Sequence, residues 1–169
     1  CPTQQKVLSL PYFKRKEMAE VRKTTRTPKT VKAKPVDEYG HLQPQAPELE
    51  EAVLGALMIE KDAYSLVSEI LRPESFYEHR HQLIYQAITA LALRQQPVDI
   101  LTVAEQLRST GDLDEVGGPF YITQLSGKVA SSAHIEYHAR IIAQKFLARE
   151  LISFTSNIQT KAFDETQDV

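Results

Sequence analysis

From Pro47 onward, apolar residues recur at the three- and four-residue spacing of an amphipathic helix. The first such segment, PELEEAVLGALMIE, opens with a proline that suits the first helical position, and the acids after it favour the N-terminal helix dipole. Its apolar face consists of Leu49, Val53, Leu54, Leu57 and Met58. The pattern predicts a helix over residues 47–60 with this face in the core.

Two further helices are predicted on either side of the segment PESFYEH. Asp62 is expected to cap the helix AYSLVSEIL, which Pro73 ends. The next helix is predicted over about residues 78–95, with Glu74 or Ser75 as its cap. The residues of this region that are expected to face the core are Leu66, Val67, Ile70, Leu71, Phe76, Tyr77, Leu83, Ile84, Ala87, Ile88 and Leu91.

Two shorter helices follow in the sequence. Asp99 is placed to cap ILTVAEQLRST, and Gly111 ends this helix in the usual C-terminal manner. Pro119 then begins the short helix PFYITQLS. No segment carries the signals of a β-strand. The sequence therefore predicts an all-α fold, in which a compact bundle of about five short helices is followed by one long projecting helix.

The last helix is predicted to start after a cap at Ser131 or Ser132 and to continue to about Ala162. Its first apolar stripe is Ile135, Ala139, Ile142 and Phe146, and its second is Leu147, Leu151, Phe154, Ile158 and Ala162. Because position 147 lies about 100° from position 146 around a helix, the apolar face changes direction there. The first stripe can close the core, whereas no earlier segment is left to cover the second.

An uncovered apolar stripe predicts a partner helix or a partner chain. The candidate self-association residues are Leu147, Leu151, Phe154 and Ile158. The alternative is that the long helix folds back on the core and buries them.

Residues 1–43 are predicted to form a disordered basic arm, and residues 44–169 to form the helical domain. Residues 1–47 hold ten lysines and arginines against four acids, whereas the rest holds ten against 18. The arm has no apolar periodicity. It is either a solubilising tail or a contact for nucleic acid or an acidic partner. The candidate nucleic-acid contacts are Arg22, Lys23, Arg26, Lys29, Lys32 and Lys34. Because the first methionine is Met18, residues 1–17 could precede the native start.

The segment EHRH brings His79 and His81 close together in the sequence. On a helix, residues two apart point to nearly opposite sides, so these histidines cannot converge on one metal ion. His134 and His138 have the spacing of a helical metal pair, but HIEYH lacks the glutamate that a zinc protease needs. EHRH is therefore interpreted as a structural helix start, in which His81 packs or caps locally.

Catalytic and cofactor motifs are not found in the sequence. The phosphate-loop pattern around Gly127 fails at Ile122 and Val129, and there is no Gly-rich dinucleotide loop. The single cysteine, Cys1, allows no internal disulfide or thiolate metal cage and fits a reducing, cytoplasmic setting. No apolar run approaches the roughly 18 residues of a membrane span. The residues alone indicate a non-catalytic, partner-binding domain without metal or cofactor.

Five segments, in order, resemble the N-terminal domain of bacterial replicative DNA helicases, the DnaB family. They are EEAVLGALMIEKDAYSLVSEIL, FYEHRHQLIYQAI, PVDILTVAEQL, the LDEVGGPFYITQL region and AHIEYHARII. The second matches the family pattern F-Y-x-x-x-H-x-x-I-[FY]-x-A-[MI] through Phe76, Tyr77 and His81, among others. In the last segment, His134 replaces the common asparagine and His138 the alanine. The resemblance covers residues 44 to about 163.

The resemblance implies a collar domain on a ring-shaped hexamer that unwinds duplex DNA using ATP. Such collars pair through helical hairpins and carry the docking surface for primase. The second stripe would then belong to the first arm of a hairpin, with the chain cut in the connecting turn. ATP and magnesium would be used by a domain further downstream, and DNA would be bound by the full helicase. This segment would not itself be an enzyme.

Two alternatives remain open at the level of the sequence. One is a stand-alone helicase or primase adaptor, or the helicase-binding domain of primase itself, which has a similar helical architecture. The other is a nucleic-acid-binding regulator that acts through the basic arm. A phosphate loop in the downstream coding sequence would distinguish the helicase from both.

Overall fold

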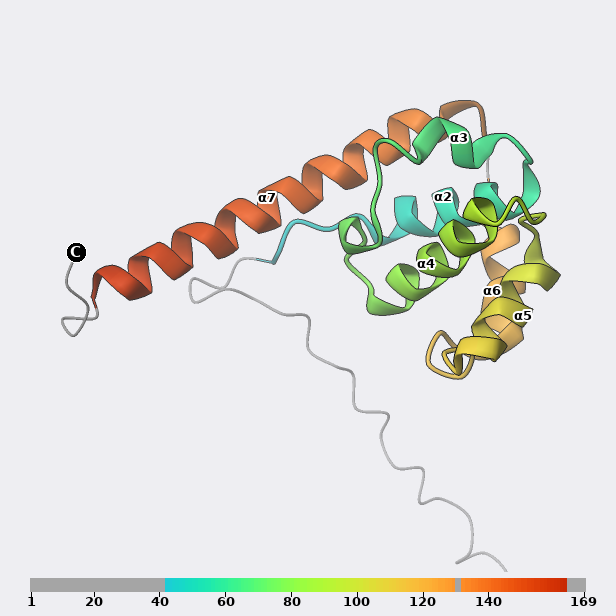
Figure 1. The fold of residues 1–169 in the computed structure, drawn as a ribbon. Helices are drawn as coiled ribbons and strands as arrows, with labels where there is room; N and C mark the ends of the chain where they lie inside the picture. Colours follow the sequence, from blue (N-terminus) through green and yellow to red (C-terminus); the bar gives the residue numbers. More distant parts are fainter. Residues whose placement is uncertain (1–41, 130–131, 164–169) are drawn as a thin grey trace, which may run out of the picture. The chain divides into compact units, whose positions relative to one another are not determined.

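The computed structural model describes residues 42–129 and 132–163, which fold as helices with no β-strand among them (Figure 1). The helices are α2 (Pro47–Ile59), α3 (Ala63–Val67), η1 (Pro73–Ser75), α4 (His79–Leu93), α5 (Ile100–Thr110), α6 (Gly118–Ser126), η2 (Ser132–His134) and α7 (Ile135–Ala162), where η marks a 3₁₀ turn. Five short α-helices thus precede one of 28 residues. This arrangement confirms the all-α prediction.

Helix α2 lies at the centre of the bundle and contacts every other α-helix of the described chain. Its residues Val53, Leu54 and Leu57 are fully buried, as the apolar periodicity predicts. The largest buried partners from the other elements are Phe76, Ile84, Tyr85, Ile88, Leu107, Ile122, Leu125 and Ile142. We call α2 to α6, together with the buried first part of α7, the head.

The close approach of α2 to α6 depends on Gly55. A Cβ atom added at this position would overlap the backbone carbonyl oxygen of Leu125, and it would lie 2.8 Å from a methyl carbon of Val129. Glycine costs helix stability because its unfolded backbone is freer than that of alanine. Here that cost is offset by contact between α2 and the end of α6.

Helix α5 has both predicted ends. The carboxylate of Asp99 accepts hydrogen bonds from the backbone N–H groups of Leu101 (2.8 Å) and Thr102 (2.9 Å). The Thr102 hydroxyl accepts one from the Asp99 N–H at 2.9 Å, which completes a reciprocal cap. Gly111 follows the helix with φ of 87°, a left-handed conformation that suits glycine.

The helix predicted after Asp62 is shorter than its apolar spacing suggested. It ends at Val67 rather than near residue 71, and the Asp62 side chain makes no cap hydrogen bond. The chain turns early, which buries Leu71 and presents its carbonyl to the Tyr85 hydroxyl at 3.2 Å. The predicted inward position of Leu66 is wrong for the same reason, since this side chain is exposed.

The predicted caps of α4 and α7 are also wrong. Glu78 occupies the cap position of α4 without a side-chain bond, while Ser75 is buried in η1 and accepts the Arg72 N–H at 3.0 Å. His134 occupies the cap position of α7, because η2 separates Ser132 from the helix. The other candidate, Ser131, lies outside the described residues.

Residues 1–41 and 164–169 lie outside the part of the chain that the structure describes. Positions 1–41 of the predicted basic arm, with its six candidate contacts, are among them, so the role of the arm stays a prediction. Within the described part, no helix is long and apolar enough to cross a membrane.

Candidate interaction helix and buried polar network

Helix α7 changes from buried to exposed along its length. Ile135, Ala139 and Ile142 are buried in the head, where α7 contacts α2, α3 and η1. Phe146 is half-buried, and every described residue from position 150 onward is exposed. The first predicted stripe therefore closes the core through three of its four members, and the fourth lies at its edge.

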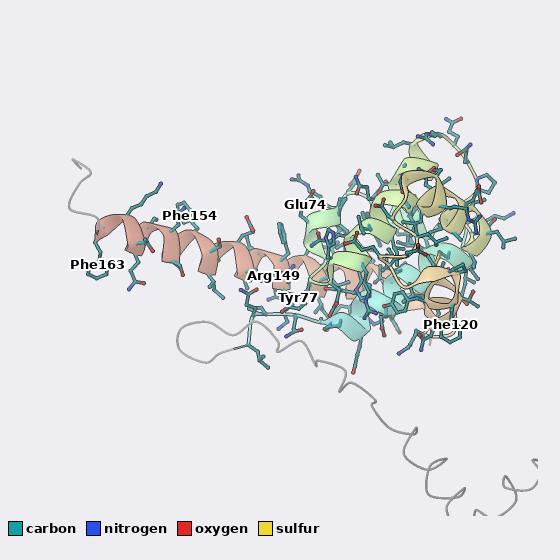
Figure 2. All side chains as sticks on the ribbon, turned by 90° about the horizontal axis from the view of Figure 1, so that it is seen from below. Glu74, Tyr77, Phe120, Arg149, Phe154 and Phe163 are labelled. Atoms are coloured by element: carbon teal, nitrogen blue, oxygen red, sulfur yellow. The ribbon has the colours of Figure 1, made fainter. Side chains whose placement is uncertain are left out.

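The second stripe is uncovered within the described chain. We call Leu147, Leu151, Phe154 and Ile158 the distal stripe; their exposed fractions are 59%, 56%, 65% and 51%. Figure 2 shows Phe154 on the part of α7 that extends beyond the head. The alternative in which this helix folds back on the core is wrong. Self-association through the distal stripe stays a prediction.

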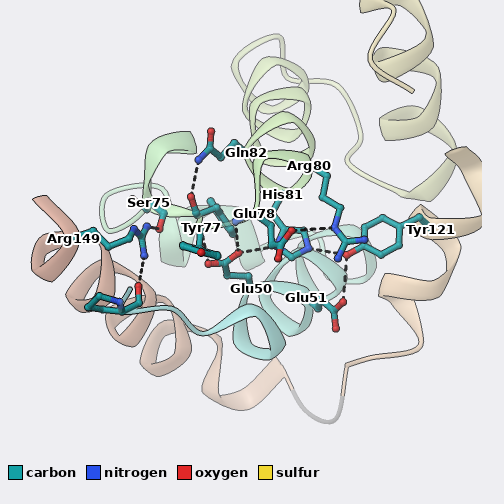
Figure 3. A network of polar contacts seen from close by, with 12 residues as sticks. Glu50, Glu51, Ser75, Tyr77, Glu78, Arg80, His81, Gln82, Tyr121 and Arg149 are labelled. Carbon is teal, nitrogen blue, oxygen red and sulfur yellow. Dashed lines mark hydrogen bonds and ion pairs between the residues drawn. The ribbon is translucent and has the colours of Figure 1, made fainter. Parts of the chain in front are cut away.

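Arg149 marks the place where α7 leaves the head. Its Nη1 donates a hydrogen bond to the carbonyl oxygen of Pro44 at 2.9 Å, and its Nη2 donates one to the carbonyl oxygen of Ser75 at 2.8 Å (Figure 3). The guanidinium carbon lies 5.5 Å from the Tyr77 ring centroid and 5.7 Å from the Phe146 ring centroid. Partial burial lowers the pKa of Arg149, whereas Glu50 acts in the opposite direction.

Glu50 is a buried carboxylate that holds the segment before α4. Its Oε1 accepts the backbone N–H of Tyr77 at 2.8 Å, and its Oε2 accepts that of Glu78 at 3.4 Å. The same Oε2 lies 2.7 Å from Nδ1 of His81, which is also buried. A buried polar side chain is tolerated when it is hydrogen-bonded, and the Glu50 carboxyl group has three such partners.

The network continues from His81 to the surface. Nε2 of His81 lies 2.7 Å from the Tyr121 hydroxyl, which donates to Glu51 Oε1 or to the imidazole (Figure 3). Glu51 forms an ion pair with Lys128 at 3.1 Å, and the Arg80 guanidinium lies 4.3 Å from the Tyr121 ring centroid. Burial raises the pKa of Tyr121 well above its ordinary value. The network thereby joins α2, α4 and α6 in the head.

The two histidines of EHRH have different surroundings, as their helical spacing predicts. His81 is buried in the network, whereas His79 is exposed and lies 3.3 Å from Glu115. No group of three or more His, Cys, Asp and Glu side chains among residues 42–129 and 132–163 is placed to hold a metal ion. The buried network therefore joins helices of the head, and the exposed His79 is not part of it.

Sequence reasoning missed the roles of Glu50 and Arg149. The sequence pattern predicts only a first-turn acid at Glu50, although this residue opens the first of the five segments that resemble the family. Arg149 lies between the half-buried Phe146 and the exposed Leu151, so its position at the change of apolar face was the available signal. Neither sequence feature identifies the residues that Glu50 and Arg149 contact, because those residues are far away in the chain.

The family model of the DnaB-like helicase N terminal domain matches residues 42–144. The chain belongs to this family. It is 48% identical over 129 residues to a replicative DNA helicase DnaB of Rhodothermus marinus, covering 76% of this chain and 14% of that protein. It is 41% identical over 131 residues to a replicative DNA helicase DnaC of Bacillus subtilis (strain 168), covering 76% of this chain and 29% of that protein.

Solved structures agree with the DnaB-like assignment. The N-terminal domain of DnaB helicase from Mycobacterium tuberculosis matches with a TM-score of 0.71 and 36% identity, covering 73% of this chain and 90% of that one. A DnaB-like replicative helicase, solved in a study of its interactions with primase, matches with a TM-score of 0.61 and 29% identity. That match covers 69% of this chain and 27% of the other.

The chain is thus the N-terminal domain of a DnaB-like replicative helicase, a protein of DNA replication. It spans less than a third of the length of the curated relatives described above. The family match ends at residue 144, before the distal stripe and Arg149.

Proposed function

We propose that this domain forms part of the collar of a hexameric replicative DNA helicase, where it pairs subunits and docks primase. The observation that carries the proposal is the exposed distal stripe on a helix that starts in the core of a DnaB-like domain. ATP hydrolysis with magnesium, and the unwinding of DNA, belong in this proposal to the remainder of the helicase.

The distal stripe has enough apolar surface to support association. A large apolar side chain contributes about 1.5–3 kcal/mol when it is fully buried. Association itself costs an estimated 4–15 kcal/mol in lost freedom and ordering, depending on the treatment. Two copies would contribute eight such side chains, each now more than half exposed. A single helix from each copy should therefore pair weakly, and a second helix in each hairpin would strengthen the pairing.

Self-association can be tested on the chain by light scattering over a range of concentrations. Replacing Leu151→Ser and Phe154→Ser together should abolish any concentration-dependent increase in mass, with the helical circular dichroism signal retained. The matched control is Leu101→Ser with Phe120→Ser, which removes two apolar side chains of the head that are each 80% exposed. Equal mass loss in the control would contradict a specific role of the distal stripe. Unfolding of the stripe variant would show that these residues stabilise the head.

Primase docking is supported by the family match and by the related helicase that was solved in a study of primase interactions. The same match favours a helicase domain over the similar domain of primase and over a stand-alone adaptor. The test is fluorescence anisotropy of the labelled chain titrated with primase from the same organism. Binding by the complete helicase, with none by this chain, would place the docking surface outside this domain.

A further inference from the structure

We infer that Arg149 is a positioning residue that fixes the direction in which α7 leaves the head. This inference goes beyond the proposed function and does not depend on it, because it concerns one chain and its own helix. The inference rests on the geometry of one guanidinium group, the segments that it joins and the position of that group at the last half-buried turn of α7.

The two hydrogen bonds of Arg149 reach parts of the chain that are far apart in sequence. Pro44 lies 105 residues away and precedes α2, while Ser75 lies 74 residues away in η1. A guanidinium group is planar and presents its N–H donors in a fixed fork, so it can bind two carbonyl oxygens with little loss of freedom. The side chain therefore fastens α7 to two separate backbone segments at once.

The segment that receives Arg149 is itself held firmly. Ser75 is buried, and its hydroxyl accepts the Arg72 N–H at 3.0 Å. The carbonyl oxygen of Phe76 accepts a hydrogen bond from Gln82 of α4 at 2.7 Å. The backbone N–H groups of the next two residues, Tyr77 and Glu78, donate hydrogen bonds to Glu50 of α2. Arg149 thus binds a carbonyl on a segment that is fixed from both α2 and α4 (Figure 3).

Other restraints on the distal half of α7 are weak. Among the described residues, the only side-chain hydrogen bonds that join α7 to the rest of the head are the two from Arg149. The fully buried contacts end at Ile142, and the half-buried Phe146 lies beside the guanidinium. Without Arg149, α7 would keep its buried contacts up to Ile142 and the partial burial of Phe146, and we expect its direction relative to the head to vary over a wider range.

The direction of α7 matters because the distal stripe begins next to Arg149. Leu147 lies two residues before it and Leu151 two residues after it. A fixed direction presents the stripe at one orientation relative to the head. The hydrogen bond from Arg149 to the carbonyl oxygen of Pro44 also ties the segment before α2 to the same point on α7.

The inference can be tested by double electron–electron resonance, which measures the distribution of distances between two spin labels. The labels are placed at Ser109→Cys on α5 and Ser156→Cys on α7, both exposed, in a Cys1→Ser background. Diluting the labelled chain with unlabelled chain removes distances between molecules, so that self-association does not affect the result. The unaltered Arg149 should give one narrow distance peak, and Arg149→Met should lose it and give a broad distribution.

The matched control is Arg140→Met, which removes the same group from an exposed ion pair with Glu136 on the same helix. It should leave the narrow peak unchanged. Arg149→Lys keeps the positive charge but lacks the forked N–H donors of the guanidinium group. Its distance distribution should be narrower than that of Arg149→Met and broader than that of the unaltered chain. A narrow peak in Arg149→Met, or equal broadening in Arg140→Met, would overturn the inference. Loss of the helical signal in Arg149→Met would also overturn it, because Arg149 would then stabilise the head as a whole.

Discussion

Nδ1 of His81 lies 2.7 Å from Oε2 of Glu50, and the exposed fractions of the two residues are 0% and 1%. The pair connects α2 to the start of α4 across 31 residues of sequence. Glu50 also accepts hydrogen bonds from the backbone N–H groups of Tyr77 and Glu78. With His81, it thus has three partners in place of the water that would solvate it in the unfolded chain. Loss of either partner would leave buried polar groups without a partner.

We predict that Glu50→Ala lowers the free energy of unfolding by about 3–5 kcal/mol, because it breaks a buried pair and leaves the His81 imidazole uncompensated. Urea unfolding followed by circular dichroism measures this change. Glu48→Ala is the control, because Glu48 is an exposed acid in the same first turn of α2. This variant should change the free energy of unfolding by less than about 0.5 kcal/mol. If Glu50→Ala and Glu48→Ala change the free energy of unfolding by similar amounts, the buried pair does not stabilise the fold.

Stability should fall at alkaline pH because of Tyr85 and Tyr121. Burial raises the pKa of both phenols above the ordinary value of 10.0. Below pH 10.0 both are protonated in the folded and unfolded states, and their contribution is fully present. As the pH rises further, the unfolded chain loses these protons first, so the free energy of unfolding decreases. Urea midpoints measured on both sides of this pH should show the decrease.

The tyrosine origin of this effect is separable from other titrations. Tyr121→Phe should make the alkaline decrease shallower, because one buried phenol no longer titrates. Tyr137→Phe removes an exposed phenol on α7 and should leave the slope as it was. Equal slopes in the unaltered chain and in Tyr121→Phe would assign the decrease to other groups.

The Tyr77 hydroxyl is a buried group with no hydrogen-bond partner among the described residues. Tyr77→Phe keeps the ring beside Arg149 and should raise the free energy of unfolding by up to about 1 kcal/mol. Tyr85→Phe is the matched comparison, because its hydroxyl donates to the Leu71 carbonyl. That variant should lose about 1 kcal/mol. Thermal melts of both variants decide the sign, and a loss in Tyr77→Phe would indicate a bound water at the hydroxyl.

The sequence predicted those features that depend on near neighbours in the chain. The cap of α5 involves Asp99 and Thr102, three residues apart, and its end depends on the conformation of Gly111 alone. The period of apolar residues similarly located α2, α4 and the change of face at Phe146. Such signals are local, so they can be recognised without knowing the fold.

Features that depend on distant contacts were not predictable in the same way. The end of α3 at Val67 reflects the burial of Leu71 and its contact with Tyr85, which tertiary packing decides. A glutamate in the first turn of a helix has the same local pattern whether it faces water or an imidazole. For Glu50, the choice is made by His81, on another helix. Long-range pairs of this kind become visible only in the structure.

The last prediction concerns Gly55, where helix propensity and packing oppose each other. Alanine in the middle of a helix is favoured over glycine by about 0.5–1 kcal/mol, so propensity alone predicts that Gly55→Ala stabilises α2. Packing predicts the reverse, because the new Cβ would overlap the Leu125 carbonyl, which belongs to the rigid backbone of α6. Forcing atoms into a packed core costs about 1–3 kcal/mol. We therefore expect Gly55→Ala to lower the urea midpoint.

Gly127→Ala is the matched control for this variant. Gly127 also has a right-handed backbone, with φ of −77°, but an added Cβ would lie 3.4 Å from the Gln124 carbonyl oxygen, an ordinary contact. Its urea midpoint should stay close to that of the unaltered chain. If both variants shift equally, the effect comes from the unfolded state rather than from packing. If Gly55→Ala raises the midpoint, α2 and α6 have room to separate, and the tight approach at Gly55 does not limit the stability of the head.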